Sequence, residues 1–155
     1  MKANIGISEE HSNSIAKKLN TLLADEHILY VKTRNFHWNV TGPNFSSLHL
    51  MFEGQYTATA LNIDLIAERI RTVGYPAAGS MKEFLALSNL KEAEGKHKAD
   101  DMVRGLLADH ESIATMLRSF IEECDGFGDE ATVDLLTGLL EQHEKTAWML
   151  RSYLE

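Results

Sequence analysis

The sequence lacks the features that build disulfide-rich, zinc-thiolate and membrane-spanning proteins. Cys124 is the only cysteine among the 155 residues, which excludes an intrachain disulfide and zinc sites built from paired cysteines. No apolar run approaches the roughly 20 residues that a membrane span requires, and Met1–Glu10 lacks the apolar centre of a secretion signal. We therefore expect a cytoplasmic protein that does not enter a membrane.

Basic residues are also scarce. The chain has 15 Lys and Arg against 23 Asp and Glu, a net charge of −8. Proteins gain affinity for nucleic acid largely by neutralising phosphates with basic side chains, so this charge disfavours a nucleic-acid partner. A surplus of carboxylates suits cations, although many acidic proteins are merely soluble. The charge alone leaves a cation-binding protein and an ordinary soluble one both open.

Proline is rare, and its two occurrences mark breaks in the chain. Residues 41–44 (Thr-Gly-Pro-Asn) must interrupt a helix, because proline lacks an amide donor and moves the preceding residue away from helical dihedrals. Residues 73–76 (Val-Gly-Tyr-Pro) have the glycine and following proline that end many helices. A third break, residues 125–129, consists almost entirely of turn-forming residues.

Between these breaks the apolar residues recur at helical spacing. In the first segment Ile15, Leu19, Leu22 and Leu29 lie three, four or seven residues apart, and polar residues separate them. No segment shows the strict alternation of a strand. The pattern predicts one domain over residues 1–155 with four long helices, near 9–40, 45–73, 98–124 and 129–153.

The lengths of the connections set the topology. Short links join the first helix to the second and the third to the fourth, so each pair is expected to be antiparallel. The link over 74–97 is long enough to travel the length of a bundle. Inside it, Ser80 and Glu83 fit a capping box, which predicts a short helix over 81–86. The fold class expected is all-α: a ferritin-like four-helix bundle with one long crossover that carries a short extra helix.

Candidate metal ligands concentrate on the second predicted helix. His49, Glu53, Asp64 and Glu68 fall at roughly 0°, 40°, 60° and 100° around its axis, on one continuous stripe. Imidazole and carboxylate together suit iron, manganese or zinc. His49 and Asp64 are, however, about 22 Å apart along a helix, so they cannot bind the same metal ion within one chain.

A second copy of the helix would solve this problem. The pairs His49/Glu68 and Glu53/Asp64 are both centred on position 58.5. If two such helices packed antiparallel about a two-fold axis at that point, each pair would meet across the contact, and one isologous interface would create two identical sites. Thr57 and Ala60 share this centre and the same stripe, and their small side chains would let the helices approach closely.

Two simpler explanations remain open from the spacing alone. His49 and Glu53 could form an exposed pair worth a few tenths of a kcal/mol, and Arg69 or Arg71 could form salt bridges with the acids. His37 favours the metal site. It ends the first predicted helix, and the antiparallel hairpin returns the chain near His49, so two histidines converge close to carboxylates.

The same residues carry a resemblance to a known family. The chain closely resembles the Dps family (DNA-protecting proteins of starved cells, or mini-ferritins) in three stretches: Phe36-His37-Trp38-Asn39-Val40-Thr41-Gly42-Pro43-Asn44-Phe45, then Leu48-His49, then Asp64-Leu65-Ile66-Ala67-Glu68-Arg69-Ile70. This ordered motif covers about residues 36–74. The remainder of the chain matches in helix layout.

The resemblance implies a ferroxidase centre, with two iron ions, between two-fold-related subunits. It assigns His37 and His49 from one chain and Asp64 and Glu68 from the other. Many members have aspartate where this chain has Glu53, which leaves open whether Glu53 binds iron directly, through water, or only at a second iron. Trp38 matches a residue beside the centre that intercepts oxidising equivalents.

The resemblance also implies the activity. Hydrogen peroxide would oxidise paired ferrous ions, with dioxygen a poorer oxidant, and ferric oxide would collect inside a hollow dodecamer. The reaction would remove ferrous iron and hydrogen peroxide, the two reagents that generate hydroxyl radical near DNA. Asp125, Glu130 and Asp134 match acidic positions that line three-fold pores, although an acidic residue at a helix N-terminus also has a purely structural explanation.

Two other functions fit the sequence less well. A non-catalytic DNA-condensing scaffold of the same fold is disfavoured, because DNA-binding members often use a lysine-rich tail and here only Lys2 precedes the first helix. We therefore expect weak DNA binding or none. A helical interaction module with a merely charged face is disfavoured by the histidines and acids above. His110 and His143, on the apolar stripes of the last two helices, are expected to be core residues.

Overall fold

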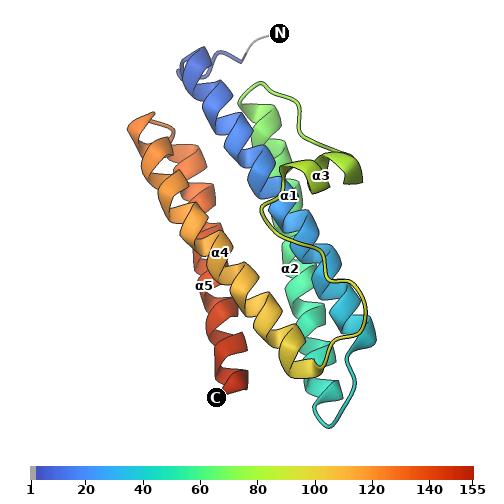
Figure 1. Cartoon of the computed structure of the whole chain (residues 1–155). Coiled ribbons are helices and arrows are strands. Elements are labelled where there is room, and N and C mark those ends of the chain that lie inside the picture. The colour runs from blue at the N-terminus through green and yellow to red at the C-terminus, as the bar shows by residue number, and fades with distance from the viewer. Residues whose placement is uncertain (1–2) are drawn as a thin grey trace.

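The computed structural model describes residues 3–155, and within them it contains five helices and no strand. Figure 1 shows how these helices are arranged. Each predicted boundary lies within two residues of the observed one, so the all-α four-helix bundle with a short extra helix is confirmed. The helices are α1 (Glu9–Asn39), α2 (Phe45–Thr72), α3 (Met81–Leu87), α4 (Ala99–Gly126) and α5 (Glu130–Leu154).

Helix starts follow from local hydrogen bonds. The Ser8 side chain accepts a hydrogen bond from the N–H of His11 at 3.1 Å and caps α1. The predicted capping box is present at α3: the Ser80 hydroxyl accepts from the N–H of Glu83 at 3.3 Å, and the Glu83 carboxylate accepts from the N–H of Ser80 at 3.0 Å. Each cap satisfies backbone donors that a helix cannot pair internally.

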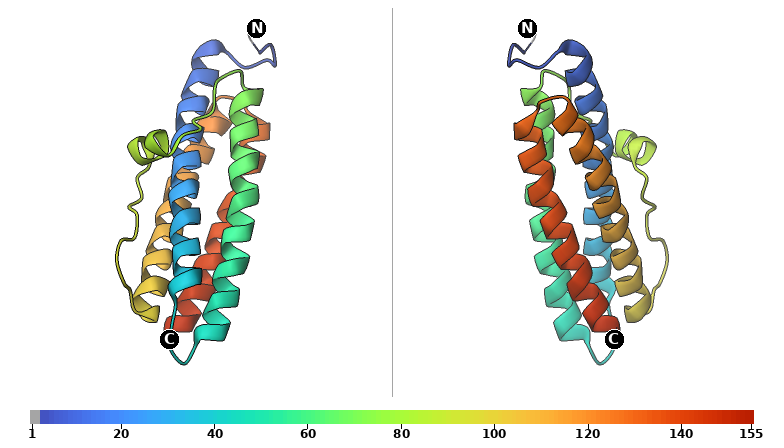
Figure 2. Two further views of the ribbon diagram at one scale, coloured as in Figure 1. Left: turned by 90° about the vertical axis from the view of Figure 1, so that its right-hand side faces the viewer. Right: turned by 90° about the vertical axis from the view of Figure 1, so that its left-hand side faces the viewer.

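The connections place the helices as predicted. α1 packs along α2 and α4 along α5, while the long link between α2 and α4 runs down the outer side of α1, with α3 beside that helix (Figures 1 and 2). The buried Asp25 on α1 holds this link: its Oδ1 accepts from the Ser88 hydroxyl at 2.6 Å and from the N–H groups of Asn89 and Leu90 at 2.6 and 3.3 Å.

The core lies between the four long helices. The largest fully buried side chains are aliphatic or aromatic, and they come from α1, α2 and α4: Phe52, Ile15, Leu19, Leu22, Leu23, Ile28, Leu29, Leu48, Ile66, Ile70, Met102 and Leu106. His110 and His143 are buried among the helices, as predicted for core residues, and so is Cys124. No helix in residues 3–155 is both long and apolar enough to cross a lipid bilayer.

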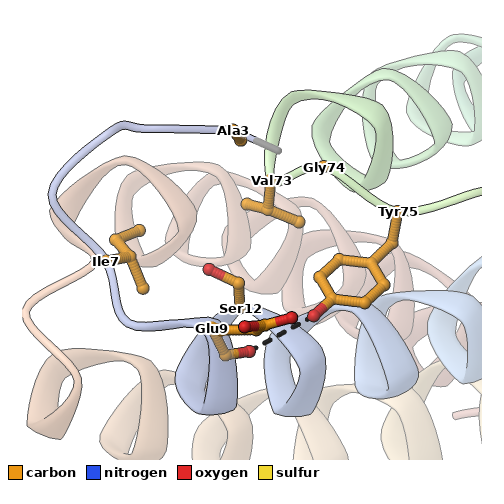
Figure 3. Close-up of a pocket in the computed structure, with 7 residues that line it drawn as sticks. All are labelled: Ala3, Ile7, Glu9, Ser12, Val73, Gly74 and Tyr75. Atoms are coloured by element: carbon orange, nitrogen blue, oxygen red, sulfur yellow. Dashed lines mark hydrogen bonds between the residues drawn. The ribbon is translucent and has the colours of Figure 1, made fainter. Parts of the chain in front are cut away.

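The two ends of the α1–α2 pair differ in chemistry. At one end Gly74, with φ of 99°, turns the chain out of α2, and a pocket of about 320 Å³ lies beside it (Figure 3). Tyr75 lines this pocket, and its hydroxyl donates to the backbone carbonyl of Glu9 at 3.2 Å. The candidate histidines lie at the other end, beside the short turn that joins α1 to α2.

Candidate metal centre

His37 and His49 form a reciprocal pair across the α1–α2 turn. Nδ1 of His37 lies 2.8 Å from the backbone oxygen of His49, and Nδ1 of His49 lies 2.8 Å from the backbone oxygen of His37. The two rings stack with centroids 3.8 Å apart. A carbonyl oxygen only accepts hydrogen bonds, so each Nδ1 carries a proton. In the neutral rings both Nε2 atoms then keep lone pairs, which is the state that binds a metal.

Aromatic neighbours hold the two rings in place. Tyr56 meets the His37 ring edge-on at 5.2 Å, and Phe45 lies 5.1 Å from the His49 ring. His37 is 8% exposed. Tyr56 was not singled out from the sequence, although its position seven residues after His49 puts it near the same helix face. Rings held in this way keep their two Nε2 atoms in one geometry.

Trp38 lies next to this pair and is exposed. Its side chain is 62% accessible, and the guanidinium carbon of Arg34 lies 4.7 Å from its ring centroid. Arg34 also donates to the Tyr30 hydroxyl at 3.0 Å. A cation over the indole face is a stabilising arrangement, so the exposed tryptophan has a defined position.

The other candidate ligands are three carboxylates on α2. Glu53, Asp64 and Glu68 are all exposed, and Asp64 is about 22 Å along the helix from His49. Within residues 3–155, no group of three or more His, Cys, Asp or Glu side chains is arranged to hold a metal ion. The chain therefore presents two imidazoles at one end of α2 and two carboxylates towards the other.

The nearby arginines do not pair with these acids. Arg69 forms an ion pair with Asp129, with 2.6 Å between Nη2 and Oδ1, and Arg71 donates to the backbone oxygen of Tyr75 at 3.0 Å. In the part of the chain that is described, neither arginine makes a salt bridge to Asp64 or Glu68. The salt-bridge explanation for the acidic stripe is thus wrong.

Part of the exposed surface of α2 is apolar in the single chain. Leu61 and Leu65 are 67% and 50% exposed, and Thr57 and Ala60 beside them are exposed as well. Leucines this exposed, in a row on one helix, are typical of a surface that another protein covers. The small residues at 57 and 60 would let a second helix approach closely.

The acidic residues near the α4–α5 turn have two different structural roles. Asp129 is only 2% exposed and caps α5, accepting from the N–H of Thr132 at 3.1 Å. Asp125, Glu130 and Asp134 are exposed around the same turn. The helix N-terminus therefore explains Asp129, which caps α5, and also favours Glu130 in the first helical turn, whereas Asp125 and Asp134 face solvent outside that turn.

Comparisons with known proteins agree with this architecture. The family profile of the ferritin-like domain matches residues 16–155. The chain is 46% identical over 133 residues to an uncharacterized low-temperature-induced protein of Nostoc, covering 84% of this chain and 74% of that one. It is 41% identical over 121 residues to DNA protection during starvation protein 2 of Bacillus anthracis, covering 78% and 83% of the two chains.

A solved structure gives the same result. The Vibrio cholerae Dps protein, described as a member of a broad superfamily of ferritin-like diiron-carboxylate proteins, superposes with a TM-score of 0.95 at 33% identity and covers 100% of this chain and 98% of its own. Matches this extensive in both sequence and fold establish a common family. This chain belongs to the Dps family of ferritin-like proteins.

Proposed function

We propose that this protein is an iron-sequestering ferroxidase of the cytoplasm. It oxidises Fe(II) with hydrogen peroxide at centres shared between two-fold-related chains, and it stores Fe(III) inside a hollow dodecamer. The observation that carries the proposal is the reciprocal His37–His49 pair, which leaves two Nε2 atoms available as ligands. The names of the Bacillus anthracis and Vibrio cholerae relatives support DNA protection and diiron chemistry respectively.

Each centre would combine groups from two chains. His37 and His49 of one chain bind ferrous ions through Nε2, and Asp64 and Glu68 of a second copy complete the site. Glu53 lies one turn after His49 and adds a carboxylate from the first chain, either to an iron directly, through water, or at the second iron only. Neutral imidazole and carboxylate are ligands suited to iron, with positions left open for an oxidant.

The reaction balances with two ferrous ions and one peroxide. Each Fe(II) gives up one electron, the O–O bond breaks, and the two oxygen atoms leave as hydroxide or water. The Nδ1–H bonds to backbone carbonyls keep both histidines in the metal-binding tautomer throughout. Trp38 lies beside the histidines, where it intercepts oxidising equivalents that are not used on iron.

Ions would reach the interior past the α4–α5 turn. Asp125, Glu130 and Asp134 are exposed there, and three copies of this turn around a three-fold axis would form an acidic ring. Such a ring raises the local concentration of cations. The same acidic character opposes DNA, because the chain has a net charge of −8. Lys2, the one basic residue before α1, lies outside the described residues.

DNA binding is therefore expected to be weak or absent. A gel-shift assay at low and moderate salt measures it directly, and a stable complex in both conditions would contradict this expectation. Such a complex would also support the alternative function, a DNA-condensing scaffold.

A complementation experiment tests the shared centre. One variant carries His37→Ala and His49→Ala, and a second carries Asp64→Ala and Glu68→Ala. Neither should bind Fe(II) at the centre or oxidise it rapidly when peroxide is added anaerobically. When the two are refolded together, half of the two-fold pairs contain one chain of each kind, and each of those pairs holds one intact centre. The mixture should then recover about one quarter of the wild-type rate.

The design separates a shared site from a site within one chain. No recovery on mixing, with both variants assembled to the wild-type mass, would overturn the shared centre. A His97→Gln variant serves as a control, since His97 is exposed and lies on the link before α4; its oxidation rate should equal that of the wild type.

A further inference from the structure

A second polar cluster lies inside the bundle, separate from the candidate metal centre. The Glu26 carboxylate on α1 accepts from Nε2 of His143 on α5 at 2.7 Å, and Nδ1 of His143 lies 2.9 Å from Nδ1 of His110 on α4. The three side chains are 0%, 3% and 4% exposed. A carboxylate and two imidazoles thus form a chain of hydrogen bonds through the core.

One arrangement of protons satisfies these bonds without charging a buried imidazole. The Glu26 carboxylate accepts the Nε2–H of His143, and with no second proton on that ring its Nδ1 has a lone pair. In this arrangement His110 donates its Nδ1–H to that lone pair, which leaves its own Nε2 as an acceptor. Burial, together with the neighbouring His143, lowers the pKa of His110 to about 3, so this ring is neutral near pH 7.

A small cavity lies against His110. It has a volume of about 30 Å³ and is lined by His110 and His143, by Gln142 and Thr146 of α5, and by Gln55, Ala58, Thr59 and Asn62 of α2. Four buried side-chain atoms in residues 3–155 have no hydrogen-bond partner: Glu26 Oε2, His110 Nε2, and both amide atoms of Gln55. All four belong to this cluster and its cavity wall.

Buried polar atoms without partners are costly, typically by 1 to 3 kcal/mol each, and in native proteins they commonly face a bound molecule. The amide nitrogen of Gln55 donates, whereas its oxygen and His110 Nε2 accept. A partner for these atoms must therefore both donate and accept hydrogen bonds. One water needs roughly 10 to 15 Å³ of such a cavity, so two oxygen atoms fit and a larger molecule does not.

A metal ion is a poor occupant of this cavity. No described group of three His, Cys, Asp or Glu side chains is placed to hold one, and the only free ligand nitrogen on the cavity wall is His110 Nε2. A divalent ion held by one imidazole and neutral amides would remain poorly compensated, because burying charge without direct counter-charge is expensive.

We propose that the cavity is a binding site for a small neutral hydroxylic molecule, a pair of waters or one hydrogen peroxide, held between His110 Nε2 and the amide of Gln55. The molecule donates a hydrogen bond to His110 Nε2 and accepts one from Gln55. None of the candidate iron ligands takes part, so the site stands or fails independently of the ferroxidase proposal.

A groove between α2 and α5 adjoins the cavity. The groove shares Gln55, Ala58, Gln142 and Thr146 with the cavity and continues along Leu50, Met51 and Met149. A small uncharged molecule can pass this partly apolar route with little desolvation cost, whereas ions are disfavoured.

Solid-state NMR of the sedimented, iron-free protein, labelled with ¹⁵N in histidine, tests the site. The wild type should show His110 with a nonprotonated Nε2 that receives magnetisation from bound water. Titration with hydrogen peroxide separates the two ligands: a saturable shift of this nitrogen assigns peroxide, and an unchanged water signal assigns water alone. Both results support the site. A protonated Nε2, or one with no contact to water or peroxide, would overturn it.

Matched variants separate binding from general packing. Gln55→Met keeps the side-chain length and removes the amide, so it should abolish the water or peroxide contact at His110. Glu141→Met introduces the same side chain at an exposed position of α5 that lines neither the cavity nor the groove, and it should leave the contact intact. Equal losses in both variants, with native secondary structure by circular dichroism, would contradict the assignment to Gln55.

Discussion

Arg69 and Asp129 join the end of α2 to the start of α5. The guanidinium lies 2.6 Å from the Asp129 carboxylate and donates to the Thr132 hydroxyl at 2.8 Å, while the same carboxylate caps α5. Asp129 is 2% exposed and Arg69 is largely buried. This contact fixes the last turn of α2, and therefore Glu68, relative to the turn that carries Glu130.

Replacing Arg69 should lower stability strongly. Arg69→Met leaves the buried Asp129 carboxylate without its counter-charge, and removing one partner of a buried pair typically costs about 3 kcal/mol or more. Arg71→Met is the control, because Arg71 is exposed and bonds only a carbonyl; it should change the free energy of unfolding by less than about 0.5 kcal/mol. Denaturant unfolding measures both, and similar values for the two variants would show that the ion pair contributes little.

Enlarging Ala60 should block assembly without unfolding the chain. Ala60 is exposed in the single chain, so the Ala60→Trp side chain has solvent to occupy there, but near the proposed two-fold axis it would hold two α2 helices apart. We expect a smaller native mass by mass spectrometry and slower Fe(II) oxidation, with unchanged helix content. Ala108→Trp, on the exposed face of α4, is the matched substitution and should leave the mass unaltered. A wild-type native mass for Ala60→Trp would show that the interface between chains does not include this face of α2.

The buried His110 should make stability depend on pH. Burial lowers the pKa of His110 from 6.5 to about 3 in the folded protein, so below pH 6.5 the unfolded chain takes up a proton that the folded protein does not. The contribution of neutral His110 to the free energy of unfolding is therefore complete above pH 6.5. It is lost as the pH falls from 6.5 towards 3, by up to about 1.4 kcal/mol per pH unit.

A His110→Gln variant lacks this titration. Its unfolding free energy should fall less steeply than that of the wild type over the same range, with a difference of about 2 kcal/mol accumulated by pH 5. His97→Gln, which removes an exposed histidine, should follow the wild-type curve. Parallel curves for His110→Gln and the wild type would mean that His110 titrates normally in the folded state.

Removing the Asp25 carboxylate should release the long link. Asp25→Ala leaves the Asn89 and Leu90 N–H groups without this acceptor, at a cost of about 1 to 3 kcal/mol. The variant should be cleaved faster between α3 and α4 by limited proteolysis than Asp100→Ala, which removes an exposed acid in the first turn of α4. Equal cleavage rates would show that other contacts hold the link.

The fold was predictable because each signal was local. Residues such as Gly42, Pro43, Ser80 and Gly74 act within a few positions of the chain, so breaks, caps and the short α3 helix could be located from sequence. The antiparallel pairing followed from link lengths alone.

The candidate site was predictable in part. The convergence of His37 and His49 followed from the hairpin, but their exchange of hydrogen bonds with each other's carbonyls depends on backbone geometry that sequence does not specify. The partner of Arg69 was also missed, because Asp129 is 60 residues away along the chain.

The buried hydrogen-bond network of Glu26 was not predicted from the apolar spacing of the helices. Glu26 occupies a position on the same apolar stripe as Leu22 and Leu29, four residues after one and three before the other. A lone acid at a core position is a signal that could have been noticed. Its partners His110 and His143 were recognised only as buried, since spacing along two other helices does not reveal which side chains meet.

The reciprocal bonds between His37 and His49 also depend on where His49 stands within α2. Adding or deleting one residue in the helix before His49, with the rest of α2 keeping its packing, would displace the histidine by about 100° around the axis and by about 1.5 Å along it, so its ring would no longer reach the opposite carbonyl. The number of helical residues between Phe45 and His49 is thus constrained as tightly as the identity of the two histidines.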